Sequence, residues 1–397
     1  MADVEVELDS GHRKNIPKVD LIVVVAMVDS IHTARWLAQF KTLNLRVMIF
    51  PSTPHRRIHP ALLEVMREST PLKVTIVPLM RQLSLPLTLL DVVFRSKTRA
   101  RYLRRVIRKQ QPQIIHGLET QHAGYLIAQA IAKLELVPKL YLSIWGSDLV
   151  WFKSFRRHER RIREILSRTD FLGVECRRDI ELAKSLGFSG KVLPIVPASG
   201  GIDVSVIDDL TALEAPSKRK KILVKGYSGF VGQSITALTA LSRLSLELRN
   251  YQVCVYSASF KTRRVAKKLS RQGRLNIRCY PKHSLSHKEV LRLFSEARIS
   301  ISISLSDGFP GSLREAMATG CFPIESTNSC GCEWAHSEKS ALFVDPQQLD
   351  GIVAAIQLLL ADDSLVESGA VLNRALVETR FSTSAVSNLI ENYYSAI

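Results

Sequence analysis

Short apolar runs alternate along the whole chain with longer segments in which apolar residues recur every three or four positions. The short runs are rich in valine, isoleucine and leucine and end in turn residues, which is typical of strands, whereas the longer segments have the period of helices. This alternation predicts βα units and mainly parallel sheets. In the first half of the chain the predicted strands are 21–28, 46–50, 73–77, 113–116, 140–144, 171–175 and 192–195.

The same alternation begins again in the second half, after the pair Gly200–Gly201 and a polar, charged stretch at 215–221. The strands predicted there are 222–225, 252–257, 276–280, 299–305 and 321–324. We therefore expect an α/β fold of two Rossmann-like, doubly wound domains that face each other across a cleft.

The domain boundaries that we expect follow from this restart. The N-terminal domain comprises residues 1–205 and the C-terminal domain residues 206–375. The remaining residues, 376–397, contain a helix predicted over 384–394, which could lie on either domain, including a return to the N-terminal one. In open parallel sheets, ligands bind beyond the carboxyl ends of the strands, so we expect the main pocket between the domains.

Composition disfavours several classes of protein. A chain of 397 residues that is 46% hydrophobic is long enough for two globular cores. Its longest apolar run, 21–28, is far shorter than the roughly 20 residues of a membrane-spanning helix, and its acidic N-terminus is unlike a secretory signal. We therefore expect a cytoplasmic protein. Six cysteines without a C-x-x-C pair indicate neither a disulfide framework nor a zinc site, and Cys330 and Cys332 are expected to be reduced thiols.

The net charge of +18 is concentrated in one segment, Arg95 to Lys109, where eight of fifteen residues are basic and none is acidic. Four apolar residues recur in it at helical spacing: Tyr102, Leu103, Val106 and Ile107. The segment is typical either of a solvated helix face or of a basic amphipathic helix on an anionic membrane surface. Because no nucleic-acid recognition motif accompanies the charge, we expect no nucleic-acid partner.

The most informative segment is 298–323, RISISISLSDGFPGSLREAMATGCFP. Large apolar residues alternate with serine through 299–305, which predicts a strand with one small-residue face on which a helix can pack closely. The strand ends near Asp307, a helix begins near Ser312, and Glu315 lies one turn into it. The N–H groups at the start of a helix suit a diphosphate, and the two carboxylates suit sugar and ribose hydroxyls. The plainer interpretation is an Asp-Gly turn and a capping box from Ser312 to Glu315.

The segment DGFPGSLREAMATGCFPI, residues 307–324, resembles the donor-binding signature of family 4 glycosyltransferases, which have the GT-B fold. In that signature two acidic residues bracket a Gly-Phe-Pro and open a Glu-Ala-Met-Ala helix. Residues 331–333 and 341–346 also fit the C-terminal half of the family. The resemblance implies a retaining enzyme that uses a nucleotide-diphosphate sugar and needs no cofactor and no metal, which agrees with the absence of an Asp-x-Asp triplet.

The resemblance also implies roles for individual residues. Asp307 would contact the donor sugar and Glu315 the ribose hydroxyls, while the backbone between them would bind the diphosphate. The implied catalytic residues are Asp307, Glu315 and Asp148. The implied donor-binding residues are Lys225, Gly226, Ser228, Gly308, Phe309, Pro310, Gly311, Ser312, Leu313 and Glu315.

Two positions depart from the family pattern. The family usually has glutamate at the position of Asp307, which keeps the charge but changes the reach of the side chain. It also usually has an arginine and a lysine after the first strand of the C-terminal domain, where this chain offers only Lys225. Arg263, Arg264 or a basic residue of the other domain could supply the second cation.

The N-terminal half resembles the family more loosely. Residues 141–148 are similar to a family strand that ends in His-Gly-Ser-Asp, with Trp145 in place of the histidine. Trp145 could stack on a sugar, or it could belong to the core while Asp148 caps a helix. The acceptor-binding residues that we expect, all near predicted strand ends, are His32, Arg35, Glu119, His122 and Trp145.

Together these features predict a hexosyltransferase that acts on a glycan or a lipid-linked acceptor in cell-surface polysaccharide or lipopolysaccharide synthesis. Its expected location is the cytoplasm, with peripheral binding to the inner face of the membrane through Arg95 to Lys109. Two alternatives stay open: a sugar-nucleotide epimerase of the same fold, and a non-catalytic basic binding protein.

Overall fold

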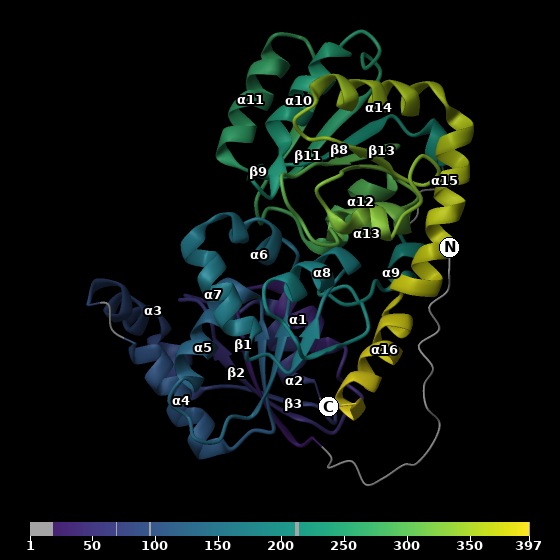
Figure 1. The fold of residues 1–397 in the computed structure, drawn as a ribbon. Helices are drawn as coiled ribbons and strands as arrows, with labels where there is room; N and C mark the ends of the chain where they lie inside the picture. The colour runs from purple at the N-terminus through teal and green to yellow at the C-terminus, as the bar shows by residue number, and fades with distance from the viewer. Residues whose placement is uncertain (1–18, 69, 95–96, 211–213, 397) are drawn as a thin grey trace.

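The structure is a computed structural model that describes residues 19–68, 70–94, 97–210 and 214–396. The N-terminal sequence, on which the expected absence of a secretory signal rests, lies outside these ranges, as does Arg95 of the basic segment. Figure 1 shows two domains, one above the other, each built on its own sheet with helices on both sides.

The N-terminal sheet has seven parallel strands in the order β3-β2-β1-β4-β5-β6-β7. Its strands are β1 Leu21–Ala26, β2 Arg46–Pro51, β3 Lys73–Ile76, β4 Ile114–Leu118, β5 Lys139–Ser143, β6 Phe171–Gly173 and β7 Lys191–Val192. The helices around it are α1 Ile31–Ala38, α2 Pro60–Arg67, α3 Pro78–Val93, α4 Thr98–Gln110, α5 Tyr125–Ile131, α6 Ser147–Val150, α7 Arg156–Leu166 and α8 Arg177–Ser185. Strand β1 is buried along its whole length, as its continuous apolar run predicts.

The C-terminal sheet has six parallel strands in the order β12-β11-β8-β13-β14-β15. Its strands are β8 Lys221–Lys225, β11 Gln252–Ala258, β12 Asn276–Pro281, β13 Ile299–Ser302, β14 Phe322–Ser326 and β15 Leu342–Val344. A two-stranded hairpin, β9 Ser228–Gly229 and β10 Gly232–Gln233, follows β8. The principal helices are α10 Ser234–Arg243, α11 Phe260–Arg271, α12 His287–Ser295, α13 Gly311–Thr319, α14 Leu349–Ala361 and α15 Asp363–Leu376, and the short α9 Val204–Asp208 lies in the linker before β8.

The predicted fold class is confirmed, and every strand predicted from the sequence overlaps a strand of the structure. Strand β15 and the hairpin β9–β10 were not predicted, because runs of two or three residues carry too little periodicity. Among the described residues, no helix is both long and apolar enough to cross a bilayer.

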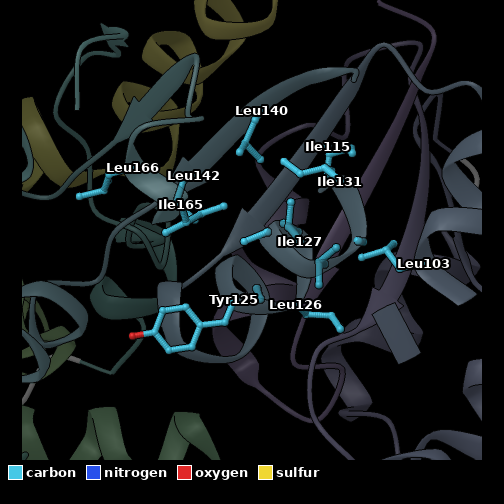
Figure 2. Packing of buried hydrophobic residues seen from close by; sticks show 14 of the residues in the cluster. Leu103, Ile115, Tyr125, Leu126, Ile127, Ile131, Leu140, Leu142, Ile165 and Leu166 are labelled. Atoms are coloured by element: carbon cyan, nitrogen blue, oxygen red, sulfur yellow. The ribbon is translucent and has the colours of Figure 1, made fainter. Parts of the chain in front are cut away.

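Large apolar clusters cover the faces of the sheets. One of them packs α4, α5 and α7 against β4 and β5, and Figure 2 shows part of it, with Leu103 of α4 near Ile127 and Ile131 of α5. The last helix, α16 Thr383–Ala396, places Val386 and Ile390 in the core of the N-terminal domain. The chain therefore crosses between the domains twice.

The two crossings lie against each other. The backbone N–H of Ile202 donates to the carbonyl of Phe381 at 2.7 Å, and the N–H of Thr383 donates back to the carbonyl of Ile202 at 2.9 Å. This short parallel bridge joins the outgoing and returning segments.

Candidate active site

The carboxyl end of the C-terminal sheet carries an ion pair. Lys225 ends β8, Asp307 follows β13, and Nζ of Lys225 lies 3.2 Å from Oδ2 of Asp307. Burial lowers the pKa of Lys225, but the attraction of Asp307 and of Glu325 outweighs it, so the net pKa is raised. Lys225 is therefore a fixed cation at the place where parallel sheets bind ligands.

Glu325 is a second carboxyl group at this edge that the sequence analysis missed. It belongs to β14, in register with Ser302 of β13, and is 1% exposed. Within the described part of the chain neither of its carboxyl oxygens makes a hydrogen bond, and burial raises its pKa well above the ordinary range despite the attraction of Lys225. An acidic residue directly after the apolar residues 322–324, at the end of a predicted strand, was the feature that could have revealed it.

Helix α13 begins directly after the predicted turn. Pro310 is its N-cap residue, no side chain caps it, and it ends at Gly320, whose φ of 73° is the left-handed conformation that favours glycine. The alternative interpretation of a capping box is wrong, because Ser312 lies inside the helix and its hydroxyl pairs with that of Ser302 at 2.7 Å. The serine face of β13 thus receives this helix closely, as the alternation predicts.

The N–H groups of Gly311 and Ser312 lie in the first turn of α13, where no earlier turn supplies a helical acceptor. Other N–H groups of the loop are already used: that of Gly308 donates to its neighbour Asp307 at 3.0 Å, and that of Phe309 donates to Oε2 of Glu175 at 3.0 Å. The donors left for an anion are therefore those of the first helical turn.

Glu315 faces the N-terminal domain from the second turn of α13. Its Oε1 lies 2.8 Å from Nε2 of His287 and 3.8 Å from a guanidinium nitrogen of Arg35, and that guanidinium also contacts Nε2 of His287 at 2.7 Å. Burial alone would raise the pKa of Glu315, but His287, Arg35 and Arg314 lower it overall. Glu315 is thus an ionised acceptor held between two domains.

A cavity of about 210 Å³ lies between the domains at this point. It is lined by Gly311, Arg314 and Glu315 of α13, His287 and Leu291 of α12, Arg35 of α1, and Gly201, Ile202, Asp203, Val206 and Thr383 of the crossings. The start of α13 therefore opens into an interdomain space, as predicted. Of the candidates for a second cation, Arg35 of the N-terminal domain lines the cavity, whereas Arg263 and Arg264 lie exposed on α11 beside Phe260.

The loop before α13 packs directly on the N-terminal domain. A Cβ on Gly146 would clash with the Cα of Gly308, and a Cβ on Gly308 would clash with Oε2 of Glu175 and the carbonyl oxygen of Trp145, so both positions require glycine. Beside them, the hydroxyl of Ser147 donates to the carbonyl of Ser306 at 2.9 Å, and Arg178 donates to the carbonyl of Asp307 at 3.2 Å. These contacts fix the position of Asp307 relative to the N-terminal sheet.

Two buried charged residues that the sequence analysis missed strengthen this contact. Glu175 accepts from Phe309 and, at 2.7 Å, from the N–H of Ala198, and burial raises its pKa to about 7. Arg314 donates to the carbonyl of Gly200 and the hydroxyl of Ser199, and burial lowers its pKa to about 10. Both residues hold the two domains together. Glu175 lies outside the quoted motif, whereas Arg314 lies within it but had no role assigned from the sequence.

His32 and Trp145 approach each other at the cleft wall, with ring centroids 5.5 Å apart. His32 keeps exposed surface in the cleft, yet burial by the surrounding protein and the charge of Arg35 lower its pKa to about 4. Within the described residues Nε1 of Trp145 is buried without a hydrogen-bond partner. His32 is therefore neutral at pH 7, and it lies within the electrostatic reach of both Asp307 and Glu315.

The other predicted residues of the N-terminal domain form a separate network. Both carboxylate oxygens of Glu119 accept backbone N–H groups of the turn 121–123, and His122 stands exposed beside it. Asp148 accepts from the N–H and hydroxyl of Thr120 and from the N–H of Trp145. Burial and the charge of Glu119 raise the pKa of Asp148 to about 8. Glu119 and Asp148 thus hold the loops that carry Trp145.

The glycine-containing loop after β8 is folded tightly. A Cβ on Gly226 would lie 2.6 Å from the Cα of Ala258, and the hydroxyl of Ser228 pairs with that of Ser259 at 2.9 Å. At the tip of this loop, Phe230 stacks on Trp151 of the N-terminal domain with ring centroids 5.0 Å apart. The loop therefore reaches across the cleft.

One prediction about cysteines is wrong. Cys330 is bonded to Cys176 in a disulfide that joins the two domains, although 154 residues separate them. The spacing of the cysteines does not reveal this pair, because only the contact between the domains brings the two sulfurs together. Cys332 is free, as predicted. Within the described residues, Cys176, Asp179 and Cys330 lie close enough together to hold a metal ion. The sulfurs of the two cysteines are, however, bonded to each other.

Solved structures of other proteins share this fold. Sucrose-phosphate synthase from Thermosynechococcus elongatus superposes with a TM-score of 0.71 at 15% identity, over 95% of this chain and 98% of the other. HepE from Anabaena in complex with UDP superposes with a TM-score of 0.68 at 13% identity, over 95% of this chain and 100% of the other. An α,α-trehalose-phosphate synthase (UDP-forming) from Burkholderia vietnamiensis superposes with a TM-score of 0.66 at 12% identity, over 95% of this chain and 100% of the other. No curated protein matches the chain.

Two family models divide the chain between them. Residues 21–171 match the family described as glycosyl transferase 4-like, and residues 209–372 match the family described as glycosyl transferases group 1. The chain is a glycosyltransferase of the GT-B type. In this GT-B glycosyltransferase the structure brings together Lys225, Asp307 and the start of α13 on one side of the cleft, with His32, Arg35 and Trp145 on the other.

Proposed function

We propose that this glycosyltransferase is a retaining enzyme of family 4 that moves a hexose from a nucleotide-diphosphate sugar to a glycan or a lipid-linked acceptor. The observation that carries the proposal is that the first turn of α13 opens into the interdomain cavity beside the ionised Glu315. N–H groups at a helix start attract phosphate, and a carboxylate beside them accepts hydrogen bonds from ribose hydroxyls.

The donor would lie along the carboxyl edge of the C-terminal sheet. Its diphosphate would accept hydrogen bonds from the N–H groups of Gly311 and Ser312 and form an ion pair with Lys225. The hydroxyls of its hexose would donate hydrogen bonds to Asp307. Because these donors are held in place before the reaction, they would stabilise the departing diphosphate without reorganising. They also supply the positive charge locally, so we propose that transfer needs no metal ion.

The acceptor would enter from the N-terminal side of the cleft. With its lowered pKa, His32 offers a neutral ring to an incoming hydroxyl, and the ring of Trp145 lies beside it, with ring centroids 5.5 Å apart. In a retaining reaction the leaving diphosphate lies on the same face as the acceptor and can take its proton, so no protein nucleophile is required. We place the reaction in cell-surface polysaccharide or lipopolysaccharide synthesis, on the cytoplasmic side.

A transfer assay tests the proposal. The HepE structures hold UDP and UDP-glucose, so UDP-hexoses are the first donors to offer, followed by GDP- and ADP-hexoses. Nucleoside diphosphate release is measured in EDTA with oligosaccharide or lipid-linked acceptors, and NMR gives the anomeric configuration of the product. Transfer with retained configuration supports the proposal. Inversion would remove the retaining assignment, and a donor that is converted to its epimer without transfer would favour the epimerase alternative.

A further inference from the structure

Helix α3 exposes an unusual amount of apolar surface. Only Met80 and Ser84 of its residues are buried, and Figure 1 shows it standing out from the edge of the N-terminal domain. The exposed apolar side chains are Leu79, Leu83, Leu85, Leu89, Leu90, Val92 and Val93, and Phe94 directly after the helix. Val92, Val93 and Phe94 are each about 70% exposed, at 71%, 68% and 71%. A continuous apolar surface of this kind marks an interaction site.

Charge is nearly absent from this helix. Its residues include one cation, Arg81, and one acid, Asp91, whose two carboxylate oxygens accept the N–H groups of Thr98 and Arg99 and so cap α4. Leu79, Leu83 and Leu90 follow one helical face at intervals of four and seven residues. The outward surface of α3 is therefore apolar over several turns.

The neighbouring α4 supplies the complementary charge. Its apolar side chains are buried: Leu103, Val106 and Ile107 belong to the core, as Figure 2 shows for Leu103. Helix α4 therefore has no apolar face left for a membrane, which changes the sequence-based expectation for this segment. The basic side chains that it exposes are Arg101, Arg105, Arg108 and Lys109.

We propose that α3 lies in one leaflet of an anionic bilayer, with its apolar face among the acyl chains and the basic side chains of α4 at the lipid phosphates. At 16 residues the helix is about 24 Å long, too short to cross a bilayer but long enough to lie along its surface. An anionic bilayer fits both features, since it offers acyl chains to the exposed apolar face of α3 and negative groups to the basic residues of α4.

The position of α3 gives this docking a direction. The helix follows β3 and so starts at the carboxyl edge of the N-terminal sheet, where His32 and Trp145 lie. Its Ser84 hydroxyl is 3.0 Å from Nδ1 of His55, in the loop after β2 at the same edge. Membrane binding would therefore bring the acceptor side of the cleft to the lipid surface. The docking itself does not depend on the proposed function.

Vesicle sedimentation tests the inference. The full chain is mixed with vesicles of phosphatidylcholine alone or with about one third phosphatidylglycerol, at low and physiological salt. We expect sedimentation with the anionic vesicles only, partly reduced by salt. Leu90→Ser/Phe94→Ser should weaken binding about tenfold or more, because two apolar side chains leave the bilayer. Leu246→Ser is the matched control, since Leu246 is 82% exposed on the C-terminal domain and should bind as the parent does.

Three results would overturn the inference: no binding to anionic vesicles, equal binding by Leu90→Ser/Phe94→Ser and the parent, or a dimer that the double variant converts to a monomer while vesicle binding is absent. The last would show that a second copy of the chain covers α3. Donor hydrolysis in the absence of membranes should be the same in the parent and the double variant, so failure of docking is distinguishable from failure of the proposed function.

Discussion

Replacing Lys225 by methionine would separate its two effects, on stability and on phosphate binding. In the parent, Nζ of Lys225 lies 3.2 Å from Oδ2 of Asp307, and Glu325 attracts it as well. Methionine fills a similar volume without charge, so these carboxyl groups lose their cation. Because the two side chains of the pair are 13% and 24% exposed, the loss is partly screened, and we expect the free energy of unfolding to fall by about 1–3 kcal/mol.

The effect of Lys225→Met on phosphate binding is a separate quantity. Loss of one charge-assisted hydrogen bond costs about 1.5–3 kcal/mol, which corresponds to a roughly 10- to 100-fold rise in Kd. Titration calorimetry should show this rise for both UDP and inorganic pyrophosphate, since the lysine would face the phosphates. Lys221→Met is the matched control, because Lys221 lies at the other end of β8 and pairs with Glu296.

A double variant, Lys225→Met/Asp307→Asn, completes the comparison. It removes the carboxylate that the first substitution leaves unpaired, so part of the lost stability should return while the affinity for pyrophosphate stays low. If Lys225→Met lost stability but bound pyrophosphate as tightly as the parent, Lys225 would only hold Asp307, and the donor site would have to be placed elsewhere.

Three further substitutions test other parts of the site. Glu315→Gln should weaken UDP roughly tenfold in calorimetry and leave pyrophosphate unchanged, because Glu315 is assigned to the ribose; equal losses for the two ligands would contradict that role. Gly308→Ala should lower the free energy of unfolding by about 1–3 kcal/mol in chemical denaturation, because its Cβ would lie 2.8 Å from the carbonyl oxygen of Trp145. Gly351→Ala is the control and should keep the stability of the parent, because its Cβ would meet nothing closer than 3.9 Å. Similar losses of stability in the two variants would count against the domain contact at Gly308. His116 is fully buried and its pKa is lowered to about 3, so below its usual pKa of 6.5 only the unfolded chain gains its proton, and stability should fall as the pH drops from about 6.5 towards 3. His116→Gln should flatten that slope in urea titrations at several pH values, and unchanged slopes would exclude this cause.

Features that depend on one continuous segment could be predicted from the sequence. Alternation of isoleucine and serine placed β13, and the small side of that strand does receive α13 through Ser302 and Ser312. The observed strand is shorter than the predicted one, since β13 ends at Ser302. Asp307 lies in the loop between β13 and α13, and Glu315 lies in α13, in the order that the motif predicts.

The residues that join the domains could not be predicted in this way. Glu175 accepts a hydrogen bond from the N–H of Phe309, which is 134 residues away in the sequence, and Cys176 is bonded to Cys330, which is 154 residues away. Such pairs depend on how two separately folded sheets face each other, which no local periodicity encodes. The capping box failed for a local reason: Pro310 starts the helix earlier, so Ser312 has no free turn to cap.

The apolar surface of α3 was visible in the sequence but was passed over. Residues 78–94 contain only Arg81 and Asp91 as charged side chains. The sequence analysis nevertheless assigned membrane binding to the basic segment that follows, because of its charge. The structure separates the two contributions, because α4 buries its apolar side and α3 does not.

The most direct test of the donor site is a crystal structure of the chain with UDP. We predict that the diphosphate accepts hydrogen bonds from the N–H groups of Gly311 and Ser312 and contacts Nζ of Lys225, and that the ribose hydroxyls donate to Glu315. A diphosphate bound away from the start of α13, or a ribose on another side chain, would contradict it.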